Sequence, residues 1–189
     1  MCAESLALYQ KLGQARGVAM ASHNLGTIEW ALHLPDHGRA RLQSALDQFR
    51  NLGDKAGEAI CLSGLASSLV RCADTPAALT RLRECLAPLE SLELARERIY
   101  FLDALGEALH AMGQPADAAR LIGAANAERI RLGAPLMPAE REEMEKLRAR
   151  IAETLGRAEA ERCLAEGAEL SGEQALAKAV ALLGPVRSG

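Results

Sequence analysis

The chain is poor in the residues and patterns on which many functional classes depend. Only 3% of its 189 residues are aromatic, and its formal net charge is −3. Because it has no basic excess to neutralise phosphates, we expect no direct binding of nucleic acid. No stretch approaches the roughly 18 consecutive apolar residues of a transmembrane helix, and the first residues lack an apolar leader. We therefore expect neither a signal peptide nor membrane association.

Motifs of common catalytic and nucleotide-binding sites are missing too. The chain contains no G-x-x-x-x-G-K-[ST] or G-x-G-x-x-G loop, no H-E-x-x-H zinc motif and no G-x-S-x-G nucleophile motif. Runs of β-branched residues with period two are also absent, which argues against strands. We predict a non-enzymatic, all-α protein without a cofactor, and keep an enzyme with an unrecognised site as the less favoured alternative.

The cysteines and histidines show no pattern typical of a metal site. The five cysteines are odd in number and lack C-x-x-C spacing, which indicates free thiols in a reducing, cytoplasmic compartment. Cys61, Cys72 and Cys85 occupy positions that are apolar or small elsewhere in the chain, so we expect them in the core. His33 and His37 have the spacing of metal ligands on a helix, but the proline between them ends the helix. We predict no metal site.

What the chain does contain is a repeat without gaps. Its leucines at positions 12, 52, 92 and 132 are spaced by 40 residues, and three other sets keep the same register. A period of roughly 20 to 50 residues is typical of a solenoid, whose units bury their apolar faces against one another. The other sets are Leu25, Leu65 and Leu105; Gly26, Ala66 and Gly106; and Gly38, Ala78 and Ala118.

Each repeat divides into two predicted helices with a turn between them. In the second unit, apolar residues recur at helical spacing as far as Ala73, and Asp74-Thr75-Pro76 then breaks the helix. Thr75 is the predicted N-cap of the next helix, with Pro76 at its first position. The repeated glycines and alanines are small enough for the two helices of a hairpin to cross closely.

Large apolar residues are interspersed with small ones at positions 102, 105, 106, 109, 113, 118, 122 and 125 of the third unit. This pattern resembles the tetratricopeptide repeat. The second unit shows the same pattern with Ala66 for glycine and Cys85 for alanine, while the first has Ser22 and Glu29 at positions that are usually apolar. The resemblance implies a right-handed α-α superhelix of helix-turn-helix units, here longer than the usual repeat of roughly 34 residues. The matching residues are Leu102, Leu105-Gly106, Leu109, Gly113, Ala118, Ile122 and Ala125.

The register predicts the domain organisation. A partial unit at 1–13 precedes three full units at about 14–53, 54–93 and 94–133, and a helical C-terminal cap follows at 134–189. The partial unit looks like the second helix of an earlier repeat, so we expect the chain to be a piece of a longer protein. In the cap, Pro138 is predicted to open a charged helix, and Ser171 with Gln174 forms a capping box for a last helix that ends at Leu183.

The segment from Ala118 to Leu183 has a second resemblance. It is similar to the extreme C-terminus of large bacterial signalling ATPases, including LuxR-type and antibiotic-regulator-type transcription factors. The similarity rests on the strings AARLIGAA, LGAPLMPAER, CLAEGAELS and QALA. In that family a nucleotide-binding module and an output domain precede a helical-repeat sensor. Because none of the nucleotide or DNA motifs falls within this chain, the resemblance implies only the sensor or scaffold role.

In tetratricopeptide arrays the first helix of each unit lines a concave groove, and the resemblance transfers this role to ten positions. Among them Arg71 and His110 suit a carboxylate, and Asp103 and Glu107 suit a basic group. An ordinary hydrated surface is the alternative, and Trp30 is either a core or edge residue or an anchor for a partner. The positions are His23, Asn24, Thr27 and Trp30 in the first unit, Ser63, Ser67 and Arg71 in the second, and Asp103, Glu107 and His110 in the third.

We therefore predict a non-catalytic sensor or protein-interaction segment of a multidomain bacterial regulator. The groove is expected to bind a protein, peptide or effector, or the upstream domains of the same polypeptide, and binding would shift how those domains sit. A stand-alone adaptor is the alternative. The apolar end of a truncated solenoid also allows a homodimer.

Overall fold

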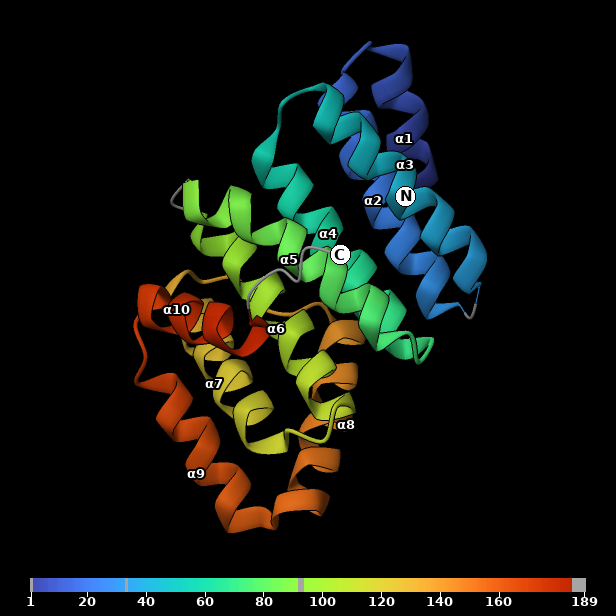
Figure 1. Cartoon of the computed structure of the whole chain (residues 1–189). Helices are drawn as coiled ribbons and strands as arrows, with labels where there is room; N and C mark the ends of the chain where they lie inside the picture. The colour runs from blue at the N-terminus through green and yellow to red at the C-terminus, as the bar shows by residue number, and fades with distance from the viewer. Residues whose placement is uncertain (1, 33, 92–93, 185–189) are drawn as a thin grey trace.

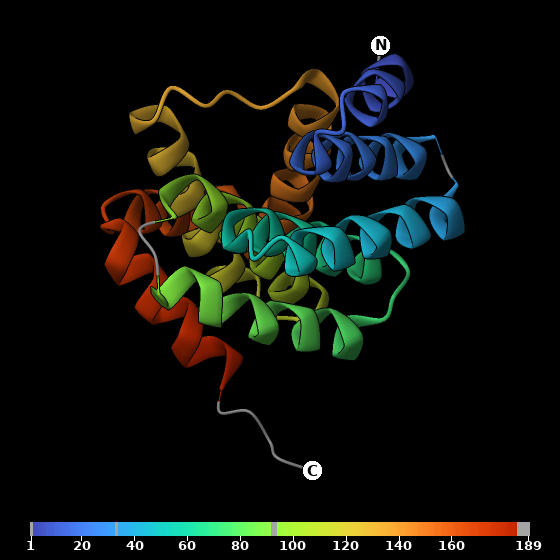
Figure 2. The ribbon, with the colours of Figure 1, turned by 90° about the horizontal axis from the view of Figure 1, so that it is seen from above.

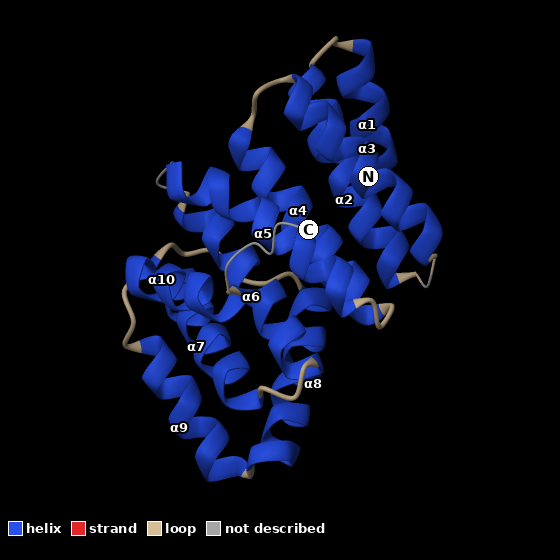
Figure 3. Ribbon diagram, viewed as in Figure 1, coloured by secondary structure: helices blue, strands red, loops and turns tan. Residues whose placement is uncertain are grey.

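The computed structural model describes residues 2–32, 34–91 and 94–184. This described part consists of ten α-helices joined by short turns and contains no strand, as predicted (Figure 3). None of the described helices has the length and apolar character needed to cross a membrane. The helices are α1 (Cys2–Lys11), α2 (Ala15–Ala31), α3 (Pro35–Asn51), α4 (Lys55–Arg71), α5 (Thr75–Ser91), α6 (Ala95–Ala111), α7 (Pro115–Arg131), α8 (Pro138–Leu155), α9 (Arg157–Ala168) and α10 (Gly172–Leu183).

Helices of equal length explain the register of the sequence. Each helix from α2 to α7 has 17 residues and is separated from the next by a three-residue connection, so two helices and two turns make one repeat. The core therefore repeats once per helix. Half of the repeat is one helix with its turn. Five fully buried side chains, one from each of the helices α3 to α7, follow this half-repeat: Leu42, Leu62, Leu82, Leu102 and Ile122.

The hairpins α2–α3, α4–α5 and α6–α7 stack one after another to form an all-α solenoid. Helix α4 packs on both α2 and α3, and α6 packs on both α4 and α5. Figure 1 shows this progression from the blue hairpin to the yellow-green one, and Figure 2 shows the same hairpins from above. Helix α1 packs on α2 at the beginning of the array. The architecture is that of a tetratricopeptide-like solenoid.

The turns share one backbone conformation. A residue with φ between 58° and 75° follows the C-cap at positions 13, 53, 73, 113 and 133. Glycine adopts this left-handed conformation without a steric penalty, and four of the five positions are glycine. After α3, the amide of Gly53 bonds the carbonyl of Arg50 and that of Asp54 bonds the carbonyl of Phe49, both at 3.0 Å. These bonds satisfy the final carbonyls of the helix and reverse the chain.

The small residues lie at the helix crossings, as the sequence predicts. A Cβ atom on Gly38 would lie 2.7 Å from the carbonyl oxygen of Gly26, and one on Gly26 would lie 3.0 Å from that of Gly38. In the third hairpin, a Cβ atom on Gly106 would lie 2.9 Å from Cγ1 of Ile122. Larger side chains would push the helices of these hairpins apart.

The C-terminal helices cover the end and one side of the array. Helix α9 packs extensively on α7, and α10 contacts α5, α6 and α7 (Figure 1). Arg83 fixes the end of α10 by donating to the carbonyl of Leu183 at 2.8 Å. The predicted capping box of α10 is present, since the amide of Gln174 donates to the hydroxyl of Ser171 at 3.1 Å. The boundary that we place at residue 133 stays a prediction.

Two local predictions differ from the structure. Cys72 is exposed because it is the C-cap of α4 and lies at a hairpin turn, whereas Cys61 and Cys85 are buried as predicted. Asp74, not Thr75, caps α5, since its carboxylate accepts from the amide of Ala77 at 3.2 Å. Three residues used in the sequence predictions, His33, Leu92 and Met1, lie outside the described residues.

Candidate functional site

A group of polar side chains lies where α4, α6 and α8 approach one another. Helix α6 contributes Asp103, Glu107 and His110, whose spacing of four and three residues places them on one face of the helix. We call the whole group the α6 polar cluster. It comprises Ser67 and Arg71 from α4, Asp103, Glu107 and His110 from α6, Arg129 from α7, and Arg148 and Arg150 from α8.

Two ion pairs connect α6 to its neighbours. Asp103 pairs with Arg129 of α7, and both side chains are largely buried, with exposed fractions of 14% and 7%. Glu107 pairs with Arg71 of α4 at 3.4 Å, and its side chain is 16% exposed. A buried pair of this kind costs desolvation energy, so it adds little to stability unless its remaining polar atoms are also bonded.

Burial shifts the titration of the groups on α6. It raises the pKa of Asp103 to about 7, against the opposing attraction of Arg129, and the charge of Glu107 adds to the rise. Burial also raises the pKa of Glu107. The charge of Arg71 and a hydrogen bond from the hydroxyl of Ser67 oppose this rise. The pKa of His110 is lowered, first by burial and then by the charge of Arg150, which favours the neutral imidazole.

The cluster contains buried polar atoms without hydrogen-bond partners in the described part of the chain. They are Oδ1 of Asp103, Oε2 of Glu107, Nδ1 of His110 and Nε of Arg148. Buried polar atoms are normally paired, and leaving one unpaired costs on the order of 1–3 kcal/mol. The cluster therefore has spare capacity both to accept and to donate hydrogen bonds.

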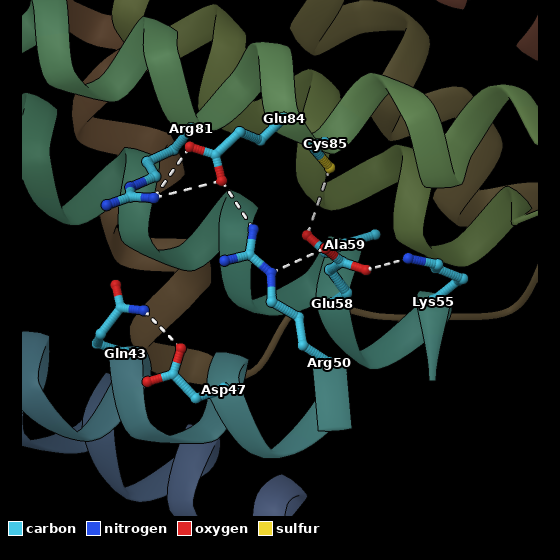
Figure 4. Close-up of polar contacts among 9 residues, drawn as sticks. All are labelled: Gln43, Asp47, Arg50, Lys55, Glu58, Ala59, Arg81, Glu84 and Cys85. Carbon is cyan, nitrogen blue, oxygen red and sulfur yellow. Dashed lines mark hydrogen bonds and ion pairs between the residues drawn. The ribbon is translucent and has the colours of Figure 1, made fainter. Parts of the chain in front are cut away.

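A second polar group, between α3, α4 and α5, differs in this respect (Figure 4). Arg50 pairs with Glu58 at 3.0 Å and with Glu84 at 2.8 Å. Glu58 forms a second ion pair with Lys55 at 2.8 Å, and Glu84 forms a second ion pair with Arg81 at 3.0 Å. None of these side chains has a buried polar atom without a partner in the described part. We read this network as a structural tie between successive repeats.

Of the ten predicted groove residues, the structure brings five together in the α6 polar cluster. Ser63 lies apart from them, because it is buried and its hydroxyl donates to the carbonyl of Ala59 at 2.9 Å and faces Cys85 at 3.7 Å. The interface between α4 and α5 therefore encloses it. The five in the cluster are Ser67, Arg71, Asp103, Glu107 and His110.

The four predicted residues on α2 form a separate group. Nε2 of His23 lies 3.4 Å from where a Cβ atom on Gly64 would be, so His23 packs between α2 and α4. Asn24 and Thr27 are exposed, and the hydroxyl of Thr27 bonds the backbone of its own helix at 2.9 and 3.1 Å. Trp30 packs against the core beside Gly38, which fits a core or edge role better than an exposed anchor.

Three arginines of the cluster, Arg129, Arg148 and Arg150, were not among the predicted groove residues, whereas Arg71 was. Arg148 and Arg150 belong to a helix of mixed charge, in which nothing marks one arginine from another. Arg129 carried a usable signal, because the repeat register aligns it with Phe49 and Leu89, both buried. A charged residue at a core position of a repeat indicates a buried partner, which is Asp103.

The described residues offer little for catalysis or metal binding. They contain no group of three or more His, Cys, Asp or Glu side chains that could hold a metal ion. Burial raises the pKa of the Cys61 and Cys85 thiols to about 12, so both are protonated at neutral pH and are weak nucleophiles. The arrangement favours reversible binding of polar groups.

Comparison with known protein families gives a match to part of the chain. Residues 17–91, which span α2 to α5, match the family described as tetratricopeptide repeat. No curated protein matches the chain. Repeats of this family generally mediate protein–protein interaction. Four of the eight residues of the α6 polar cluster lie on the α6–α7 hairpin, which follows the matched residues and continues their register.

Proposed function

We propose that this chain, whose residues 17–91 match the tetratricopeptide repeat, is a non-catalytic segment that binds a protein or peptide across α4, α6 and α8. One observation carries the proposal: four buried polar atoms of the α6 polar cluster have no hydrogen-bond partner among the described residues. A partner that bonds these atoms gains the usual hydrogen-bond energy and also removes the cost of leaving them unpaired.

The chemistry of the cluster suits an extended peptide. Backbone amides of a partner would donate to Oδ1 of Asp103 and Oε2 of Glu107 after displacing the side chains that cover these buried atoms, while its carbonyl or carboxylate oxygens would accept from Arg71, Arg148 and Arg150. Each such bond contributes about 0.5–1.5 kcal/mol, and more where a charged group takes part. Several bonds along one helix face give both affinity and register.

We further propose that the segment is the sensor of a multidomain bacterial regulator. The resemblance of residues 118–183 to the C-terminus of signalling ATPases supports this context. In such a protein, a partner that binds the repeats more tightly in one arrangement of the upstream domains would shift the population toward that arrangement.

Partner capture tests the binding role. The tagged chain and its Glu107→Ala and Arg71→Ala variants are used to capture proteins from the source organism, and each captured protein is quantified. We expect the specific partner to be reduced about tenfold by either variant. Glu161→Ala is the matched control, because Glu161 is exposed on α9 and outside the cluster. Equal capture by all four proteins would contradict the proposed surface.

The regulatory context needs a separate test on the complete gene. Deleting the codons for this segment should change the output of the upstream domains, measured as transcription of the target genes. An unchanged output, or a reading frame that encodes only this chain, would contradict the sensor role and favour a stand-alone adaptor that uses the same surface.

A further inference from the structure

A pocket lies between the end of α7 and the beginning of α8, beneath the segment that connects them. Its volume is about 360 Å³. Residues 126, 129, 130 and 133 line it from one side, and residues 141, 144, 145 and 148 from the other. In both sets the later residues follow the first by three, four and seven positions, the spacing of a single helix face, so two helix faces oppose each other across the pocket.

Arginines dominate the charge of this pocket. Arg129, Arg141 and Arg148 line it together with one acidic residue, Glu145. Arg129 is paired with Asp103, but neither Arg141 nor Arg148 forms an ion pair within the described part of the chain. Nε of Arg148 is buried there without a hydrogen-bond partner. The lining therefore carries an excess of positive charge that an anion would balance.

The two inner arginines also affect each other. The pKa of Arg148 is lowered, first by burial and also by the positive charge of Arg129, while Asp103 and Glu145 only partly oppose this. A buried cation with incomplete compensation is costly, and a carboxylate placed between two guanidinium groups would relieve that cost through charge-assisted hydrogen bonds.

The remaining lining is apolar. Ile130, Pro135, Leu136 and Met144 form walls next to the arginines. A fully hydrated inorganic anion would leave these walls in contact with water. A molecule with a carboxylate at one end and a short hydrocarbon group at the other would use both halves of the lining, and the volume suits a small ligand or one terminal residue of a peptide.

We propose that the pocket between α7 and α8 binds a carboxylate attached to a small apolar group. Arg148 and Arg141 are its charge partners, and Arg129 forms the inner wall. The carboxylate belongs either to a free organic acid or to the C-terminal residue of a peptide. This site shares Arg129, Arg148 and helix α8 with the α6 polar cluster. It goes beyond the proposed function because its other walls are α7 and residues 133–136 rather than α4 and α6.

Titration calorimetry with simple probes tests the proposal on the full chain. Hexanoate is compared with hexanol and hexylammonium, which have the same number of carbon atoms but carry a neutral and a positively charged head group. We expect saturable binding of hexanoate and at least about tenfold weaker binding of the other two probes. A short peptide that ends in leucine, with a free or an amidated C-terminus, distinguishes a chain terminus from a free acid.

Substitutions locate the binding. Arg148→Gln should lower the affinity for whichever carboxylate probe binds by about tenfold. Arg141→Gln, at an exposed position that tolerates replacement, should lower that affinity severalfold. Arg157→Gln changes the same charge at a remote, exposed site on α9 and should leave binding unchanged. The proposal is wrong if neither hexanoate nor the peptide with a free C-terminus binds saturably, or if hexanol binds as tightly as hexanoate. It is also wrong if Arg141→Gln and Arg148→Gln both leave the affinity unaltered.

Discussion

At the scale of the residue, Asp103 couples the fold to pH. Its pKa is near 3.8 in an unfolded chain and about 7 in the folded one. Between these values the native state binds more protons than the unfolded state. Protonated Asp103 therefore contributes to the free energy of unfolding at low pH, and this contribution is lost as pH rises through 7.

The substitution Asp103→Asn removes this titration while it keeps an acceptor for Arg129. As pH rises from about 5 to about 8, the unsubstituted chain should lose about 2 kcal/mol of unfolding free energy relative to the Asp103→Asn variant. Urea denaturation followed by circular dichroism at both pH values measures it. Asp47→Asn, at an exposed position on α3, is the control, and a difference that does not change with pH would refute the expectation.

Ala73 is the exception among the turn residues. It has a φ of 60° at a position where the other described turns have glycine. A left-handed alanine costs roughly 1 kcal/mol or more, so Ala73→Gly should raise the unfolding free energy by about 0.5 kcal/mol after the entropy cost of glycine. Ala40→Gly, inside α3, should instead lower it by about 1 kcal/mol. Thermal unfolding of both variants checks whether the signs are opposite.

The residue scale is also where prediction from the sequence was least complete. Cys72 and Cys61 are the same residue type in one helix, yet only the position of Cys72 at a turn exposes it. Periodicity places a residue on a face but does not show which long side chain reaches across to a neighbour. For that reason Arg71, Asp103 and Glu107 could be selected as candidates, while Arg148 could not. Arg129 could have been selected only from its register with the buried Phe49 and Leu89.

At the scale of the element, the contact of α7 with α9 is the closest crossing in the cap. A Cβ atom on Gly123 would overlap the backbone carbonyl of Leu164, and one on Gly167 would overlap that of Arg120. Two backbones meet at these points, and neither can move without separating the helices. The glycines therefore set the distance between the cap and the last repeat.

This close crossing predicts a strong effect from a single methyl group. Gly167→Ala should lower the unfolding free energy by about 3 kcal/mol, because the helices must move apart. Gly64→Ala is the matched control inside α4, where the nearest atom would lie at an ordinary 3.4 Å, and higher helix propensity should make it neutral or stabilising. Equal destabilisation of the two variants in denaturant unfolding would contradict this account of the crossing.

Helix existence and limits were predicted well because turn chemistry marks them. Pro138 begins α8, and Ser171 with Gln174 begins α10, as their capping patterns indicate. The packing partner of α9 was not predictable in the same way. Its sequence shows a helix, but the match between Gly123 and Gly167 joins residues from different elements and appears only when the two helices are placed together.

At the scale of the whole molecule, the solenoid predicts a gradient of stability. Helix α1 packs on α2 at the beginning of the array, and Leu8 in α1 and Leu12 just after it are exposed, whereas α4 and α6 are covered on both sides. In hydrogen exchange followed by mass spectrometry, amides of α1 should exchange at least about 100-fold faster than those of α4 and α6. Uniform protection along the chain would instead indicate a single cooperative unit.

The exposed leucines Leu8 and Leu12 also bear on the predicted homodimer, which stays a prediction. The repeat itself was the most predictable property, because a fixed period is written directly in the sequence and each unit contacts mainly its neighbours. What could not be predicted is the shape of the surfaces that the array presents, since these depend on how the C-terminal helices close over its end.

Arg129 belongs to both of the proposed binding surfaces. It lines the pocket between α7 and α8, and it is the counter-ion of Asp103 in the α6 polar cluster. An anion in the pocket competes with Asp103 for the same guanidinium. Binding of an anion in the pocket would therefore change the charge balance of Asp103 in the α6 polar cluster. This coupling would need no movement of a helix.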